Sequence, residues 1–426
     1  MILSLFGVFF LCCLVGVPVG ISLGLACVAT VFIGAPVSLK YISQGMVVAL
    51  DSFPLMAAPL FILAGELMSQ GGVSKRLLNL AHLLLGRYAG GLGLVAIASC
   101  IFFAGISGTG SADAAAIGVI MIPEMLRGGY SKGFSGSMIA AAGAIGPIIP
   151  PSVTMVVYCV TTNQSITDTF LAGVVPGILM GVSLLAYTFI ISKRKGYRGE
   201  AKTYTRKEVF DIIWDAKWAI LVPVIIMGGI YGGIFTPTEA AAVAVIYGYI
   251  AGLFLYKELT FKQLPRVILS SALITSVVLV IIGTSIGFGR LMTLEHIPQQ
   301  VTAFITDIST NKYVILAMIN LLLLLVGTFM ETLAAVTILA PILLPVVTSL
   351  GVSPVHFGVI MVVNLCIGFV TPPLGANLFV ITQIADIPYG TLCRSVAPWL
   401  AIMVAVLFLI TYIEAIPMGL VWLFRG

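Results

Sequence analysis

The chain has 426 residues, of which 60% are hydrophobic and only 9% are charged, with a formal net charge of +5. Soluble domains carry roughly a quarter of charged residues, so a soluble protein of this length could not bury so much apolar surface. Most of the chain must therefore lie in a lipid bilayer. The small, dispersed positive charge gives no reason to expect nucleic-acid binding, and the seven cysteines have neither metal-ligand nor redox spacing.

Apolar segments long enough to cross a bilayer occur in both halves of the chain. In the first half they are 2–17, 19–35, 53–70, 133–162 and 168–192, and in the second half 218–235, 238–256, 267–289, 355–383 and 395–416. A strongly polar, basic stretch at 193–217 separates the halves. Each half also has two apolar arms that meet at a polar tip, 92–106 with 111–126 and 314–327 with 332–350.

An internal repeat relates residues 105–176 to residues 327–398 without a gap. Helix-breaking residues of the first half recur 222 positions later: Gly105, Pro123, Gly146, Pro150, Pro151 and Pro176 correspond to Gly327, Pro345, Gly368, Pro372, Pro373 and Pro398. Because glycine and proline determine where a helix can kink, end or open, their repetition indicates a repeated backbone shape. In so apolar a chain this pattern is typical of secondary transporters with a binding site between the halves.

Charge distribution predicts that the halves have opposite orientations. Five basic residues flank the base of the first pair of arms: Lys75, Arg76, Arg87, Arg127 and Lys132. The positive-inside rule places them, and the basic stretch 193–217, in the cytoplasm. The second pair is flanked by Glu295, Asp307 and Lys312 before it and by an uncharged stretch after it, which suits the outer side.

Each pair of arms could be two spans or one re-entrant hairpin. If both are hairpins, each half crosses five times, an odd number, and the second half must be inverted.

The predicted fold is therefore an all-α polytopic membrane protein with inverted repeats, two re-entrant hairpins and two proline-broken helices. The first repeat, 1–192, would comprise scaffold helices in 1–70, a surface arm at 73–88, a hairpin at 92–128, a broken helix at 133–163 and a helix at 168–192. A cytoplasmic linker follows at 193–217. The second repeat, 218–426, would comprise scaffold helices in 218–289, an arm at 297–308, a hairpin at 314–350, a broken helix at 355–385 and a helix at 395–416.

The first tip and the first broken helix predict a cation site. The tip offers hydroxyls and free carbonyls, which are tolerated at membrane depth only where they are buried in protein or line a cavity. The Pro150-Pro151 pair should open its span into two half-helices, whose ends present carbonyls to a cation and N–H groups to an anion. The proposed ligands are Ser107, Gly108, Thr109 and Ser111 of the tip with Gly146, Ile149, Pro150 and Ser152 of the break. Small-residue helix packing and a simple kink are the alternative interpretations.

The second half repeats this arrangement. Its proposed cation ligands are Gly327, Thr328, Glu331 and Thr332 of the tip with Gly368, Thr371, Pro372 and Gly375 of the break. Hard oxygen donors of this kind suit an alkali cation rather than a transition metal. An anionic solute would lie between the two sites, in contact with Ser107, Ser152, Thr154, Thr332 and Asn377.

Carboxylates within apolar segments are the remaining candidates. Asp113 and Glu331 flank the two tips, and Glu331 could either complete a cation site or cap a helix. Glu239 follows Thr236-Pro237-Thr238, a helix-start pattern, and should accept hydrogen bonds from free N–H groups. The histidines, His82, His296 and His356, are expected at the surface. No zinc-protease, phosphate-loop or Gly-x-Ser-x-Gly motif occurs, so we expect neither an enzyme nor ATP hydrolysis on this chain.

These motifs resemble the large membrane subunit of the tripartite ATP-independent periplasmic (TRAP) transporters over nearly the whole chain. The resemblance is carried by the blocks at 51–68, 108–118, 143–152, 232–243 and 371–377. Two of them read Gly143-Ala-Ile-Gly-Pro-Ile-Ile-Pro-Pro-Ser152 and Thr371-Pro-Pro-Leu-Gly-Ala-Asn377.

The resemblance implies sodium-coupled uptake of an organic acid anion, such as sialic acid or a C4-dicarboxylate, across the bacterial inner membrane. It implies delivery by a periplasmic substrate-binding protein and an elevator motion of hairpins and broken helices against a scaffold. A small four-helix membrane subunit would join that scaffold. The coupling ion would be sodium, bound at 107–111 with 146–152 and at 327–332 with 368–377, and no other cofactor is implied.

Three other functions compete with this interpretation. A standalone ion-coupled carboxylate transporter or ion exchanger could share the inverted-repeat design. An intramembrane enzyme would need a catalytic pair, yet the best candidates, Asp113 and Glu331, belong to opposite repeats. A passive channel would conduct without sodium coupling.

Overall fold

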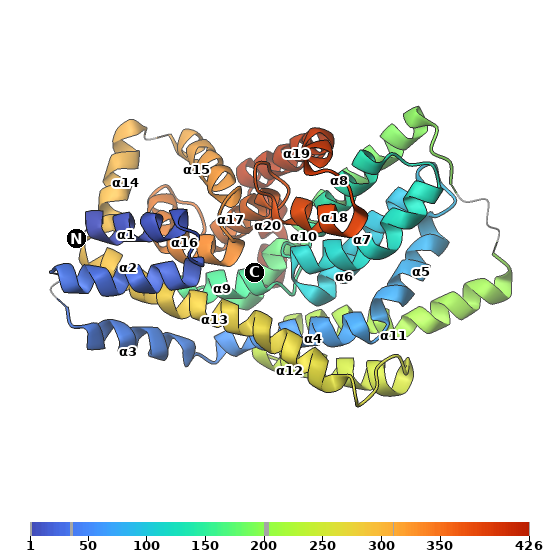
Figure 1. Cartoon of the computed structure of the whole chain (residues 1–426), viewed down its shortest axis with the longest axis horizontal. Coiled ribbons are helices and arrows are strands. Elements are labelled where there is room, and N and C mark those ends of the chain that lie inside the picture. The colour runs from blue at the N-terminus through green and yellow to red at the C-terminus, as the bar shows by residue number, and fades with distance from the viewer. Residues whose placement is uncertain (1, 35–36, 200–203, 310, 426) are drawn as a thin grey trace.

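The computed structural model describes residues 2–34, 37–199, 204–309 and 311–425, and every regular element within them is a helix (Figure 1). The first half contains α1 (Ile2–Leu14), α2 (Val19–Ile33), α3 (Leu39–Leu50), η1 (Pro54–Met56), α4 (Ala57–Gln70), α5 (Val73–Leu85), α6 (Gly91–Ser107), α7 (Gly110–Arg127), α8 (Lys132–Gly143), α9 (Val153–Thr162) and α10 (Ile166–Lys195). The second contains α11 (Arg206–Tyr231), α12 (Pro237–Ile250), the π-helical turn η2 (Ala251–Leu255), α13 (Leu264–Leu294), α14 (Ile297–Ile308), α15 (Lys312–Gly327), α16 (Thr332–Ser349), α17 (Pro354–Gly368), α18 (Ala376–Ala385), α19 (Tyr389–Tyr412) and α20 (Ala415–Arg425).

The helices of the two halves follow the same order with nearly the same spacing. Helix α16 begins and ends 222 positions after α7, and α17 begins 222 positions after α8. Helix α18 begins and ends 223 positions after α9. The sequence repeat therefore corresponds to a repeat of helical elements.

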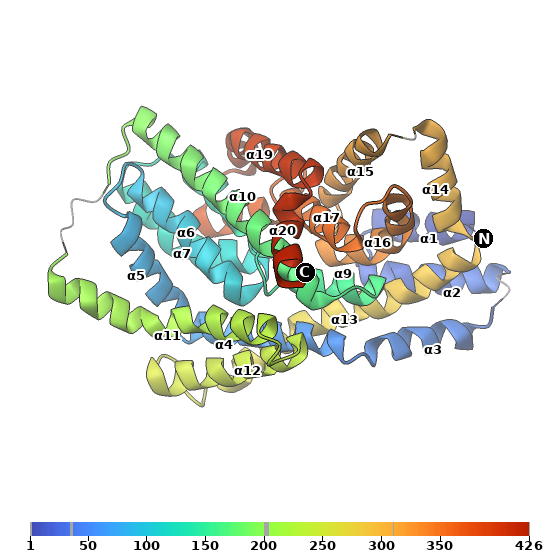
Figure 2. The same ribbon diagram turned by 180° about the vertical axis from the view of Figure 1, so that it is seen from behind.

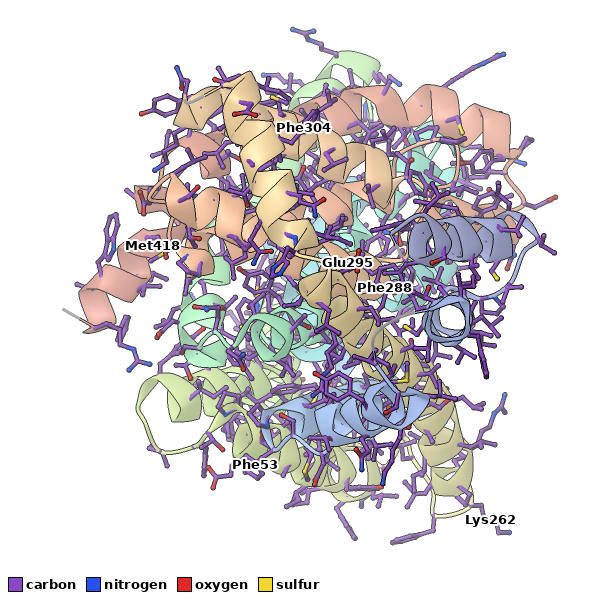
Figure 3. The ribbon with its side chains drawn as sticks, turned by 90° about the vertical axis from the view of Figure 1, so that its left-hand side faces the viewer. Phe53, Lys262, Phe288, Glu295, Phe304 and Met418 are labelled. Carbon is purple, nitrogen blue, oxygen red and sulfur yellow. The ribbon has the colours of Figure 1, made fainter. Side chains whose placement is uncertain are left out.

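The repeat is broken in one span of the scaffold. In the first half, α3 and the η1–α4 segment meet at an angle of 61° around Asp51–Phe53, whereas the corresponding segment of the second half is the continuous 31-residue helix α13. Figure 3 shows α13 running from near Lys262 to Glu295, with α14 and Phe304 beyond it. Helices α3 and α4 both pack on α13, so the two parts of the bent span lie along the long helix.

Two groups of helices lie on opposite long sides of the molecule. Helices α3, α4, α13, α12 and α11 form a row along one side, and α15 and α19 lie on the other (Figures 1 and 2). Helix α12 packs on α4, and α11 packs on α5 and α12. The hairpins α6–α7 and α15–α16 pack against the broken helices, which are α8 with α9 and α17 with α18.

Each hairpin packs on both broken helices. Helix α7 contacts α8 of its own half and α18 of the other half, while α16 contacts α17 of its own half and α9 of the other. Buried hydrogen bonds also join the broken helices to their neighbours: Trp399 Nε1 donates to Ser137 Oγ (3.0 Å) between α19 and α8, and Asn364 Nδ2 donates to Asn320 Oδ1 (2.8 Å) between α17 and α15. The hairpins and broken helices thus form one packed body.

Among the described residues, five helices are long and apolar enough to cross a membrane, or six if the bent pair α3–α4 is one span. They are α10, α12 with η2, α13, α16 and α19. Large apolar side chains on α11 and α13, including Phe210, Trp214 and Leu273, are exposed. Such surfaces require lipid or a partner, as expected for a polytopic membrane protein.

Three expectations need correction. The predicted linker 193–217 is shorter, because α10 continues to Lys195 and α11 begins at Arg206 with a Thr205–Glu208 capping box; within it, residues 200–203 lie outside the described residues. The stretch between the predicted spans 19–35 and 53–70 contains a further helix, α3. His356 is buried rather than at the surface, with Nε2 2.9 Å from the Ile410 carbonyl oxygen, because the start of α17 is covered by α19.

Candidate functional site

The first tip lies directly against the first helix break. Helix α6 ends at Ser107 and α7 begins at Gly110, and between them Gly108 has a positive φ of 61°. A Cβ on Gly108 would lie 2.6 Å from the Pro151 carbonyl oxygen. Only glycine therefore combines this backbone conformation with this close approach.

The first break leaves backbone oxygens without partners. Ser152 caps α9, since its Oγ accepts from Met155 N (3.2 Å) and donates to the Pro147 carbonyl (2.6 Å). Within the described part of the chain, no hydrogen bond reaches the carbonyl oxygens of residues 148–151. The Pro150–Pro151 peptide bond is cis, as is Pro372–Pro373 at the second break. Unpaired carbonyls in a buried segment are available to a cation.

Asp113 adds a carboxylate to this first site. It is fully buried, and one of its oxygens accepts a short hydrogen bond from Ser107 Oγ. The other, Oδ2, has no hydrogen-bond partner among the described residues. A Cβ on Gly146 would lie 2.5 Å from this oxygen and 2.9 Å from the Thr109 carbonyl oxygen. The structure thus brings together the tip, the break and a buried carboxylate oxygen, a donor set suited to a hard cation. Asp113 was expected beside the tip from its place in the sequence, but it was not among the predicted ligands.

The other proposed ligands of the first site have different surroundings. Ser111, in the first turn of α7, is partly exposed. The Ile149 side chain packs on Gly177 of α10, so only its backbone can face a cation.

The second site repeats the close approach of tip and break. The backbones of Gly327, at the end of α15, and Gly368, at the end of α17, are in contact, and a Cβ on Gly368 would lie 2.7 Å from the Gly327 Cα. The Thr328 and Thr371 hydroxyls donate to the carbonyls of Leu325 (2.7 Å) and Ile367 (2.8 Å). Their lone pairs remain free to act as acceptors for a cation. Pro372 is partly exposed, and Gly375 precedes α18 with a φ of 56°.

Glu331 caps the second arm of the second hairpin. One of its carboxylate oxygens, Oε2, accepts from Leu333 N (3.0 Å) and Ala334 N (3.1 Å). The helix-cap interpretation is therefore confirmed, while a cation contact through its other oxygen stays a prediction. The capping role expected for Glu239 is also confirmed, by the reciprocal hydrogen bonds between Thr236 and Glu239.

The residues proposed to contact a solute lie on both tips and beside both helix breaks. Asn377, at the start of α18, is fully buried and donates from Nδ2 to the Ala140 carbonyl of α8 (2.9 Å), while its Oδ1 has no partner among the described residues. A Cβ on Gly110 would lie 3.1 Å from the Phe369 ring, so the first tip abuts the second break. Ser152 and Thr154 are buried at the start of α9, while Thr332 is buried on the second tip.

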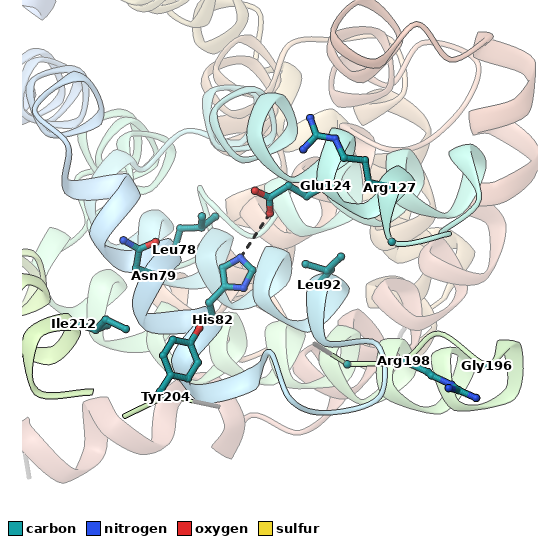
Figure 4. A pocket seen from close by; sticks show the side chains of 12 residues that line it. Leu78, Asn79, His82, Leu92, Glu124, Arg127, Gly196, Arg198, Tyr204 and Ile212 are labelled. Carbon is teal, nitrogen blue, oxygen red and sulfur yellow. Dashed lines mark ion pairs between the residues drawn. The ribbon is translucent and has the colours of Figure 1, made fainter. Parts of the chain in front are cut away.

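A cavity lies away from both tips. It has a volume of about 950 Å³ and opens at the base of the first hairpin, between the arm α5, the end of α7 and the segment before α11 (Figure 4). His82 of α5 and Glu124 of α7 face each other across it, with Nε2 and Oε2 3.8 Å apart.

The arm α5 is also fixed to the row of scaffold helices. Arg76 pairs with Asp215 of α11 (3.2 Å) and with Glu258, and its guanidinium lies 4.2 Å from the Tyr256 ring centre. The arm therefore connects the scaffold row to the hairpin.

A repeated all-helical bundle with opened helices at its centre defines a class, that of polytopic membrane transport proteins. A solved structure of similar fold is the Alcanivorax borkumensis YdaH transporter, with a TM-score of 0.64 at 15% identity over 91% of this chain and 90% of that chain. At this identity the likeness concerns the fold alone.

Sequence comparison identifies the family. A family model described as "Tripartite ATP-independent periplasmic transporter, DctM component" matches residues 6–416. The chain is 50% identical over 414 residues to the isethionate TRAP transporter permease protein DctMQ of Oleidesulfovibrio alaskensis, covering 97% of this chain and 65% of that protein. It is 40% identical to the sialic acid large permease SiaM of Vibrio cholerae (96% of both chains) and 39% identical to the C4-dicarboxylate large permease DctM of Pseudomonas aeruginosa (94% and 93%).

The chain thus belongs to the DctM family, the large permease components of tripartite ATP-independent periplasmic transporters. It is accordingly a multi-pass protein of the bacterial inner membrane.

Proposed function

We propose that this chain uses a sodium gradient to drive uptake of an organic acid anion. The observation that carries the proposal is the repeated contact between a polar tip and an opened helix, at Gly108–Pro151 in one half and Gly327–Gly368 in the other. Carbonyl and hydroxyl oxygens lie beside each contact, and the Asp113 carboxylate lies beside the first. Such donors suit sodium, and half-helix N-termini beside them suit an anion. The solute would be of the kinds named for the relatives: isethionate, a C4-dicarboxylate or sialic acid.

Transport would proceed by an elevator motion. The moving body would comprise both hairpins, both broken helices, α10 and α19, since each hairpin packs on both broken helices. The scaffold would comprise α1–α4 and α11–α13, with opposite orientations of the two repeats. The arm α5, fixed to the scaffold by Arg76 and in contact with α6 and α7, would carry the connection between them, as α14 would in the second half.

Two partners complete the proposed transporter. A periplasmic substrate-binding protein would deliver the anion, and a small four-helix membrane subunit would cover part of the exposed apolar surface of the scaffold. The alternative is a standalone ion-coupled carboxylate transporter, which would need neither partner.

The test is uptake into proteoliposomes containing this chain and the small subunit, with the binding protein outside. Isethionate, succinate and N-acetylneuraminate would be tried, each with and without an inward sodium gradient. We expect one of them to be accumulated only with sodium and much faster with the binding protein. Ser107→Ala and Thr371→Ala should raise the half-maximal sodium concentration. Equal uptake in potassium would contradict sodium coupling, and equal uptake without the binding protein would favour the standalone transporter.

A further inference from the structure

A second cavity, of about 420 Å³, lies between the long scaffold helix α13 and the second hairpin. Its wall combines scaffold residues from α3 and α13 with residues of the proposed moving body from α9 and α16. Polar and aromatic lining residues include Tyr41, Thr161, Ser285, Arg290, Thr293 and Thr337. The cavity is separate from the tips, since no residue of 107–111 or 327–332 lines it.

Arg290 of α13 is a cation in this cavity without an ion-pair partner. No carboxylate of the described chain lies within 4.0 Å of its guanidinium. The group is held in place instead by packing. A Cβ on Gly45 would lie only 2.7 Å from Arg290 Cζ, so the guanidinium fits here because residue 45 is glycine. Arg290 Cζ also lies 5.4 Å from the Tyr41 ring centre. A charge in an apolar helix that lacks a partner is a functional-site hypothesis by default.

Comparison of the repeats places a charge of opposite sign opposite Arg290. The end of α4 at Gln70 lies 224 positions before the end of α13 at Leu294. At this offset Gly65-Glu66-Leu67-Met68 matches Gly289-Arg290-Leu291-Met292, so Arg290 corresponds to Glu66. Glu66 accepts a hydrogen bond from Gln70 on its own helix, whereas Arg290 has no ion-pair partner among the described residues.

The surroundings of Arg290 suit a small organic anion. The Thr337 hydroxyl donates to Ser285 Oγ (2.8 Å), which bridges α16 and α13 at the cavity wall, and Thr293 is exposed one turn after Arg290. A guanidinium can hold a carboxylate or sulfonate through two parallel hydrogen bonds, with hydroxyls beside it for other polar groups. The volume lies within the range of about 300–1,000 Å³ typical of small-ligand pockets.

We propose that Arg290 binds the acidic group of the transported solute in this cavity, before the solute reaches the tips. The inference rests on the proposed function for the identity of the ligand as a carboxylate or sulfonate. Because the wall contains both scaffold and moving elements, a solute bound here would contact both. Arg290 then selects for anions at a place remote from the cation sites.

The test measures anion binding without requiring transport. A cysteine at Thr293 (Thr293→Cys) is reacted with the anionic reagent 2-sulfonatoethyl methanethiosulfonate and with its cationic trimethylammonium counterpart, and the parent chain gives the background. We expect Arg290→Gln to lower the anionic-to-cationic rate ratio by about three- to tenfold, as expected for the loss of one nearby charge in a wet site. Arg290→Lys should keep most of it, and the matched variant Lys312→Gln, which alters a cation outside the cavity, should leave it unchanged. Thr161→Cys is a second reporter on the same wall.

Solute protection completes the test. Choline isethionate, choline succinate or choline N-acetylneuraminate should slow labelling of Thr293→Cys when Arg290 is present and not in Arg290→Gln. In uptake, Arg290→Gln should raise the solute KM about tenfold while the half-maximal sodium concentration stays constant. An unchanged rate ratio in Arg290→Gln at both reporters would overturn the proposal. Protection without any sodium-driven uptake would instead refute the proposed function and leave the site standing.

Discussion

Adding one methyl group at Gly146 or Gly368 should separate a hairpin tip from its helix break. Both residues have ordinary backbone conformations, because neither has a positive φ, so alanine is excluded only by lack of space. At Gly368 the methyl would meet three backbone atoms of Gly327, two of them at 2.5 and 2.7 Å. At Gly146 it would meet Asp113 Oδ2 at 2.5 Å and the Thr109 carbonyl at 2.9 Å.

The cost can be judged from these contacts. Overpacking a tight site typically costs about 1–3 kcal/mol, and the upper end applies at Gly368 because backbone atoms cannot rotate away. If the tip must close on the break to bind sodium, that cost appears as weaker binding. Since about 1.4 kcal/mol is a factor of ten, the half-maximal sodium concentration should rise by about 5- to 150-fold.

The assay is sodium titration of uptake in proteoliposomes, alongside thermal denaturation of the purified variants. Gly228→Ala is the matched control, because a Cβ there meets nothing within 4 Å on a helix of the scaffold. It should leave sodium dependence unchanged. A Gly368→Ala variant with parental thermal stability and parental sodium dependence would refute the idea that tip and break form one cation site.

Three further variants separate coupling, packing and motion. Asp113→Asn should raise the half-maximal sodium concentration more than about tenfold in the same titration, since it removes a buried carboxylate beside the first site; unchanged dependence would remove this residue from the ligands. Asn320→Ala should lower stability by about 1–3 kcal/mol in thermal denaturation, because it leaves Asn364 Nδ2 without the Asn320 acceptor, and sodium dependence should stay constant. Arg76→Gln should lower the maximal uptake rate without altering half-maximal sodium, because it loosens the arm from α11; a parental rate would show that this anchor is dispensable.

The tips and breaks could be predicted from sequence because their signals are local. Glycine and proline restrict the backbone wherever they stand, and the repeat doubled each signal. The expected arms 92–106 and 111–126 each end within one residue of α6 and α7 at the tip. The same holds for Glu239, whose capping role follows from three neighbouring residues.

Features that depend on tertiary packing could not be predicted in this way. The burial of His356 results from contact between α17 and α19, which no local pattern reports. Helix α3 was not predicted because Lys40, Ser43 and Gln44 interrupt its apolar sequence. In the fold it packs on α13. The start of α11, by contrast, could have been predicted from the sequence, since Thr205 and Glu208 have capping-box spacing.

Sequence reasoning left two functional candidates out of the predicted sites. One could be recognised only in the structure, and the other could have been found from the sequence. Asp113 was recognised as a membrane carboxylate, but its orphan oxygen facing Gly146 is visible only in the structure. Arg290 could have been found by aligning the repeats, where it stands opposite Glu66, a residue of opposite charge. Differences between repeats, as well as their shared positions, are therefore informative in such chains.

The opposite orientation of the two repeats is the central claim, because hairpins, sites and elevator motion all depend on it. The most direct measurement is side-specific labelling of single cysteines placed at Arg127 and Leu350, the bases of the first and second hairpins. A membrane-impermeant thiol reagent, applied to intact cells and to inverted vesicles, should label the first only from the cytoplasm and the second only from the periplasm. Labelling of both positions from the same side would contradict the inverted repeat.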